Sequence, residues 1–155
     1  MTYRIRGLSP EPFRHLYGLT DAELQRRHVV RMDVTGQPGF PCRVSLEDVA
    51  EGGTVLLLNH VSHDVANPYR AAHAIFVEEG AEEFGDYLDS VPPVFAGRTL
   101  SLRGFDDAGM MADALLAAPG ETHASIRRLF ANPAIAYIHA HNAVRGCFSA
   151  RVDRA

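Results

Sequence analysis

The sequence predicts an α+β domain with a largely antiparallel sheet, and three of its features point to this class. Most apolar residues fall in short runs that alternate with polar ones, as in strands with one buried face. Helical spacing is confined to two short stretches near the start and one late stretch, and no strand–helix unit repeats. With 155 residues, 46% of them hydrophobic and 22% charged, the chain can bury a core as a single domain over residues 1–155.

The N-terminal segment is expected to form one strand and two short helices. The strand covers residues 3–6. Ser9 as N-cap and Pro10 at the first helical position begin the first helix. The second helix begins at Thr20, where Glu23 three residues later completes a capping box.

The middle of the chain is expected to form short strands joined by loops. The apolar run at 54–58 is continuous, which suits a central strand covered on both faces. Alternating strands are expected at 30–34, 42–46, 73–77 and 99–103. Gly36, Pro38 and Pro41 predict a turn-rich loop, and residues 59–70 predict a polar loop.

The last third of the chain is expected to form a strand, one late helix and a closing β-hairpin. Residues 109–118 fit both a helix and a strand, and we favour the strand. A helix is expected over 121–131, where apolar residues share one face and Pro133 stops the helix. The alternation from Ile135 to Arg154 then predicts the C-terminal hairpin.

This hairpin is expected to have one apolar and one polar face. We predict a register with His141 opposite Cys147 and the turn at 142–146, because this pairing keeps the apolar residues together. The polar face then carries Tyr137, His139, His141, Cys147, Ser149 and Arg151. The apolar face carries Ile138, Ala140, Phe148 and Val152.

Composition excludes several classes of function. A net charge of −4 without a long run of arginine argues against nucleic-acid binding. No apolar run approaches the roughly 20 residues of a membrane span, and the start lacks a signal-peptide core, so we expect a cytoplasmic protein with Cys42 and Cys147 as free thiols. The sequence has no lysine, which excludes a Schiff base, a pyridoxal-phosphate anchor and a Walker phosphate loop.

Several long strings in the chain carry a family resemblance. They are PGFPCRVSL at 38–46, NPYR at 67–70, IFV at 75–77, GMM at 109–111 and the ending HAHNAVRGCFSARVDRA. Through these strings nearly the whole chain resembles a bacterial family catalogued as domain of unknown function number twelve hundred and three. The resemblance implies a soluble bacterial single domain. The family has no established activity, so the resemblance identifies no functional residues.

One hypothesis for the histidines is a metal site. His139 and His141 lie two apart on one predicted strand face, with Cα atoms about 6.5–7 Å apart, so both imidazoles could reach one ion. Further ligands could come from His60, His63, Asp64 and Cys147. The competing interpretation is that these histidines are solvated or hydrogen-bonded beneath a loop. The sequence therefore leaves the metal, and any other cofactor, unknown.

A second hypothesis makes Cys147 a catalytic nucleophile together with His139 and His141. In the predicted register His141 would activate the thiol, and Arg151 on the same face would favour the thiolate. The alternative is that the thiols only pack in the interior, as free cysteines commonly do. This alternative fits Cys42 best, because it alternates with apolar neighbours.

A third hypothesis is a site for a small anionic ligand, built from Arg43, Arg70, His73 and Arg151. Arg43 follows one glycine–proline loop and Arg70 ends another, and loops at strand ends often carry binding residues. Arginine forks match carboxylates and phosphates. The alternative is that these arginines only pair with surface acids.

These residues lead to two hypotheses of function. The first is a small-molecule enzyme or ligand-binding protein whose His/Cys/Arg face takes an anionic ligand. The second is a non-catalytic protein-interaction module, or a homodimer interface, on the same face. A concave pocket would favour the first hypothesis, and a flat surface ringed by apolar residues would favour the second. The sequence does not give the substrate, the reaction or the oligomeric state.

Overall fold

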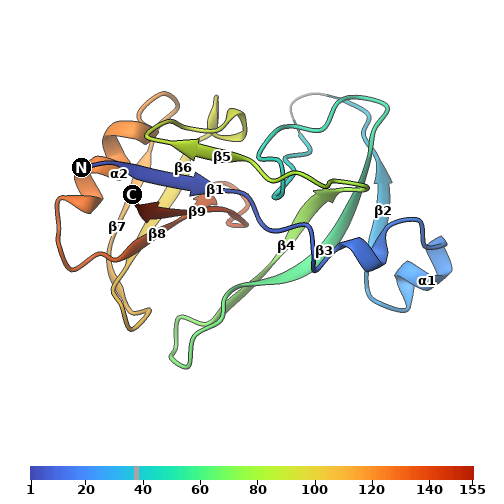
Figure 1. The fold of residues 1–155 in the computed structure, drawn as a ribbon, viewed down its shortest axis with the longest axis horizontal. Helices are drawn as coiled ribbons and strands as arrows, with labels where there is room; N and C mark the ends of the chain where they lie inside the picture. Colours follow the sequence, from blue (N-terminus) through green and yellow to red (C-terminus); the bar gives the residue numbers. More distant parts are fainter. Residues whose placement is uncertain (37–38) are drawn as a thin grey trace.

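The structure is a computed structural model, and it describes residues 1–36 and 39–155. Within this part of the chain, nine strands form two antiparallel sheets (Figure 1). The larger sheet has the order β5-β1-β9-β8-β6-β7, and the smaller has the order β2-β3-β4. The larger contains β1 (Tyr3–Arg6), β5 (Asp86–Leu88), β6 (Leu100–Phe105), β7 (Met111–Ala117), β8 (Tyr137–Asn142) and β9 (Phe148–Arg154). The smaller contains β2 (Val30–Asp33), β3 (Thr54–His63) and β4 (Ala71–Glu78).

The predicted strands mostly form, with two corrections. β3 continues through residues 59–63, where a polar loop was predicted, because β4 pairs with it as far as His63. Residues 42–46 are not a strand. The Leu46 N–H donates to the Cys42 carbonyl across a turn, and Leu46 has a φ of 60°. The expected loop residue Pro38 lies outside the described residues.

The late helix is confirmed as α2 (Thr122–Phe130), which buries Ile126 and Leu129 against the larger sheet. The pair of N-terminal helices is not confirmed. The first is a 3₁₀ turn, η1 (Arg14–Leu16), and the second, α1 (Asp21–Gln25), is only five residues long. A further 3₁₀ turn, η2 (Pro93–Phe95), precedes β6. No helix among the described residues is long and apolar enough to cross a membrane.

The capping box at the start of α1 is present as predicted. The Glu23 backbone N–H donates to Thr20 Oγ1, and the Thr20 N–H donates in return to the Glu23 carboxylate. This local signal is recognisable from the sequence because both partners lie within one turn.

The C-terminal hairpin forms, but the predicted register is wrong. His141 pairs with Phe148 and not with Cys147, because the register shifts next to Ala140. Ser149 is the extra residue of a β-bulge in β9, and a bulge interrupts the alternation of side chains. Phe148 therefore lies on the histidine face, with its ring centroid 5.8 Å from that of His141.

Each sheet has its own apolar core. One cluster lies between the larger sheet and α2 and includes Leu102, Ile138 and Val152. The other lies on the smaller sheet and includes Leu56 and Leu24, the latter from the N-terminal segment. The face of the larger sheet opposite α2 contacts the β3–β4 hairpin through histidine, tyrosine and phenylalanine rings. This layer of rings between the sheets holds the candidate site.

Candidate functional site

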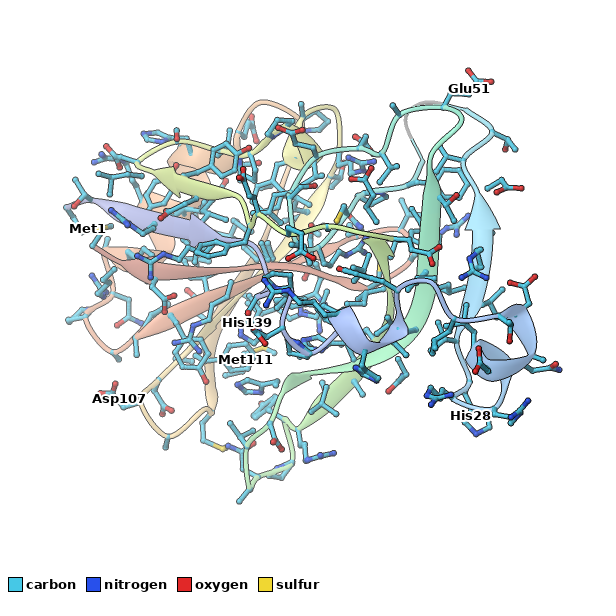
Figure 2. All side chains as sticks on the ribbon, turned by 45° about the vertical axis from the view of Figure 1, so that its right-hand side comes forward. Met1, His28, Glu51, Asp107, Met111 and His139 are labelled. Carbon is cyan, nitrogen blue, oxygen red and sulfur yellow. The ribbon has the colours of Figure 1, made fainter. Side chains whose placement is uncertain are left out.

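The site is built on two strands that approach each other from different sheets. His139 and His141 project from β8 and are each only 2% exposed. The His139 ring lies 5.0 Å from that of His63 on β3, and the His141 ring lies 4.9 Å from that of His73 on β4. Figure 2 shows His139 near the middle of the molecule, between the larger sheet and the long β3–β4 hairpin. Distant parts of the sequence therefore converge on one histidine layer.

A β-bulge at the end of β3 directs two consecutive residues toward this layer. Val61 pairs with Ala72 and His63 pairs with Ala71, which leaves Ser62 as the extra residue. Side chains normally alternate along a strand, and a bulge suspends that alternation. Ser62 and His63 consequently line the same hollow.

This hollow, which we call the histidine cavity, has a volume of about 200 Å³. Its polar lining consists mainly of Ser62, His63, Arg70, Arg103, His139 and His141. The rings of Tyr69 and Phe105 supply apolar wall. The hollow thus combines two cations with three imidazoles, which is the chemistry expected for recognition of a small polar molecule.

Hydrogen bonds to both ring nitrogens hold the His63 side chain in place. His63 Nδ1 lies 2.9 Å from the Tyr69 carbonyl, and Nε2 lies 2.8 Å from the Tyr137 hydroxyl. A carbonyl oxygen only accepts, so Nδ1–H donates to Tyr69, and in the neutral imidazole the Tyr137 hydroxyl donates to Nε2. Tyr137 and Tyr69 therefore fix both the orientation and the tautomer of His63.

His141 is held in a similar way from the hairpin turn. Its Nδ1–H donates to the Gly146 carbonyl at 2.9 Å. Burial lowers the pKa of His141 to about 4, although the bond to Gly146 opposes that shift. His141 is therefore neutral at pH 7, and its Nε2 keeps a lone pair.

His139 is the most strongly perturbed histidine of the layer. Burial, followed by the nearby His63 and His141, lowers its pKa to about 3. Its Nδ1 is buried and has no hydrogen-bond partner among the described residues. Leaving such a group unsatisfied costs about 1–3 kcal/mol, so a ligand that hydrogen-bonds to His139 would recover free energy.

Arg103 supplies a cation whose charge has no local counterion. Its Nε donates a 3.4 Å bond to Ser101, and among the described residues it makes no ion pair. Burial lowers its pKa, with no acidic group acting in the opposite direction. Arg70, at the rim, instead pairs with Asp64 at 3.2 Å. Arg103 is therefore the group in the cavity best placed to receive an anion.

A second hollow, which we call the cysteine groove, has a volume of about 720 Å³ and is lined in part by Arg43, His73 and Cys147. Arg43 is only 2% exposed and bridges three groups. It donates to the Phe148 carbonyl at 2.8 Å, the Pro41 carbonyl at 2.6 Å and Cys147 Sγ at 3.2 Å. Burial lowers the pKa of Arg43, and the sulfur of Cys147 opposes this effect. The free thiol of Cys147 thus has Arg43 as its cationic partner, and not the predicted Arg151.

The structure divides the predicted site residues between these hollows. The histidine cavity receives His139, His141 and Arg70, and the cysteine groove receives Arg43, His73 and Cys147. Arg151 lines neither hollow. Its Nε donates to Asp153 at 2.8 Å, and its guanidinium lies 3.9 Å from the centre of the Tyr137 ring.

Three of the predicted metal ligands, His63, His139 and His141, lie close together but are not arranged to hold a metal ion. Among the residues that the structure describes, no group of three or more histidine, cysteine, aspartate or glutamate side chains is arranged to hold a metal ion. His63 uses both ring nitrogens in bonds to protein groups, and Asp64 pairs with Arg70.

Sequence reasoning missed two polar side chains of the cavity lining, Arg103 and Ser62. Arg103 could have been found, because it alternates with apolar Leu100 and Leu102 and so falls on the polar face of β6. Ser62 carries no such signal, because its position in the cavity depends on the bulge in β3.

Comparison with known proteins gives one match. A family model described as "Protein of unknown function (DUF1203)" matches residues 39–154, a range that includes the residues named here for both hollows. No curated protein and no solved structure matches the chain.

Proposed function

Because the chain belongs to the family of proteins of unknown function DUF1203, we propose a function from its own site: the histidine cavity binds a small anionic molecule. One observation carries this proposal. Arg103, a cation without a carboxylate partner among the described residues, lines the same cavity as His139, whose buried Nδ1 lacks a hydrogen bond. An anion would neutralise the first group, and a hydroxyl or amino group on the same molecule would satisfy the second.

The neutral state of the histidines favours this kind of ligand. At pH 7 the low pKa values of His139 and His141 leave each imidazole with one N–H and one lone pair. These two imidazoles then add no positive charge to the cavity, whereas Arg70 and Arg103 both line it. The site is suited to a small carboxylate or phosphate that also carries a hydrogen-bonding group, such as a hydroxy acid.

The depth of the site supports a ligand more than a docked protein. His139 and His141 are covered by the β3–β4 hairpin and do not form a flat outer surface. A protein interface would place its central side chains on an accessible surface of about 800 Å² per partner. The interaction module therefore has less support than the ligand-binding protein.

A thermal-shift series tests the proposal. Phosphate, malonate and lactate would each be added at about 10 mM, with sodium chloride at matched ionic strength as the reference. A ligand at about one hundred times its dissociation constant stabilises by about 2.7 kcal/mol, and for a chain of this length each kcal/mol raises Tm by about 2–4 °C. We expect at least one of the three anions to raise Tm by about 5 °C or more.

The matched variants are Arg103→Gln and Arg128→Gln. Arg128 is exposed on α2, so its removal changes the net charge equally without touching the cavity. The anion-dependent shift should disappear in Arg103→Gln and persist in Arg128→Gln. The proposal fails if no anion exceeds the salt reference, or if the two variants respond alike.

A further inference from the structure

Ser62 and His73 form a pair that anion binding alone does not use. Ser62 Oγ, at the bulge in β3, lies 3.0 Å from His73 Nδ1 on the neighbouring strand β4. Ser62 lines the histidine cavity, whereas His73 lines the cysteine groove. The hydrogen bond between Ser62 and His73 therefore links the two hollows.

The surroundings of His73 keep it in the basic form. Burial lowers its pKa, and the positive charge of Arg103 lowers it further. The other groups that face His73 are the imidazoles of His60, its cross-strand partner, and His141. No carboxylate forms an ion pair with His73 in the described part of the chain, so nothing there favours the imidazolium at pH 7.

We propose that Ser62 is a nucleophile and His73 its general base in acyl transfer from a small ester that carries an anionic group. This inference rests on the proposed function, because Arg103 would hold the anionic group in the same cavity. His139, whose buried Nδ1 has no hydrogen-bond partner among the described residues, also lines this cavity and would give the substrate a second polar contact. A serine within hydrogen-bond reach of a neutral imidazole is the arrangement that such catalysis requires.

The reaction needs no reactant other than the ester and water. As Ser62 Oγ bonds to the ester carbonyl carbon, its proton passes to His73 Nδ1, and the carbonyl oxygen becomes an oxyanion. The oxyanion collapses, the bond from carbon to the leaving alkoxide oxygen breaks, and the proton on His73 Nδ1 goes to that oxygen. Water then attacks the carbonyl carbon of the acyl-serine and gives one proton to His73. The bond from that carbon to Ser62 Oγ breaks, His73 returns the proton to Oγ, and the acid is released.

A purely structural role for the pair is the alternative, because Ser62 Oγ also lies 3.4 Å from the Ala71 carbonyl. A fluorophosphonate probe separates the two roles. Its phosphorus bonds to an activated serine oxygen and fluoride leaves, so an intact-mass shift followed by peptide mapping identifies the serine in the wild-type protein. We expect a single adduct on Ser62.

Two substitutions test the mechanism. Ser62→Ala should abolish the adduct, and His73→Gln should slow labelling by about 100-fold or more, which is the usual contribution of a general base. Ser125→Ala and His15→Gln are matched controls outside the cavity and should label like wild type. An adduct on another serine, no adduct, or labelling at the wild-type rate in His73→Gln would overturn the proposal.

Anion binding is measured on the same proteins so that the two proposals can fail separately. In wild type, the rise of Tm with each anion is compared with the labelling of Ser62. If that rise is present but Ser62 is not labelled, the acyl-transfer proposal falls and the ligand site stands. If Ser62 is labelled but no anion raises Tm, the ligand proposal falls.

Discussion

Acidification should weaken the fold through the two buried histidines of β8. Folded His139 and His141 have pKa values of about 3 and about 4, whereas an unfolded histidine has a pKa of about 6.5. Between these values the unfolded chain binds protons that the folded chain does not bind. Stability is therefore complete above about pH 6.5 and is lost as the pH falls toward the two folded values.

The size of the effect follows from these pKa values. At about pH 5 each unfolded imidazole is protonated while His139 and His141 remain neutral in the folded state. The gap of about 1.5 pH units, at about 1.36 kcal/mol per unit, gives about 2 kcal/mol per histidine, or about 4 kcal/mol together. This is a large share of the 5–15 kcal/mol, roughly, that stabilises a typical domain.

Urea unfolding at about pH 7.5 and about pH 5 measures this loss. The double variant His139→Gln/His141→Gln should lose about 4 kcal/mol less than wild type over the same interval. His60 and His73, whose pKa values burial also lowers, account for pH dependence that the double variant retains. Exposed His15→Gln should behave as wild type. Equal losses in the double variant and wild type would refute this account of the histidine layer.

Two further predictions concern packing and thiol access. Phe148→Ala should destabilise the protein by about 3–5 kcal/mol, because the ring is buried among the imidazoles, whereas Thr20→Ala should cost only about 1 kcal/mol through the lost cap. Equal urea midpoints for these two variants would contradict that ranking. Iodoacetamide should alkylate Cys147, which lines the cysteine groove, at least about ten times faster than the fully buried Cys42, as followed by peptide mapping. Equal rates would mean that the groove does not expose the thiol.

Local sequence signals predicted most of the helices and strands, but not the strand register, the bulges or the contact between the sheets. Hydrophobic patterns located every described strand except β5, although the strand expected at 42–46 is a turn. The Thr20 capping box located the start of α1, because this signal also depends on residues close in sequence. The hairpin register depended on one extra residue, Ser149, whose bulge has no marker in an alternating pattern. The polar end of β3 looked like a loop because its histidines are covered by another sheet, which the sequence alone cannot place.

The candidate site was predicted in composition more than in arrangement. His139 and His141 share a face because they are two apart on one strand, and that inference needs no tertiary contact. Cys147 lies apart from these histidines and contacts Arg43 instead. That contact joins positions about a hundred residues apart in sequence. No spacing rule gives a contact of that kind.

The two apolar clusters have a consequence for how the molecule moves. Because each sheet buries its own aliphatic side chains, parting the sheets would expose the histidine, tyrosine and phenylalanine rings between them and leave both cores intact. Backbone amide hydrogens at the interface between the sheets should therefore exchange with solvent when the sheets part. This partial opening should cost less free energy than global unfolding. A molecule bound in the histidine cavity would contact both sheets, so its binding should slow the opening of the interface between them.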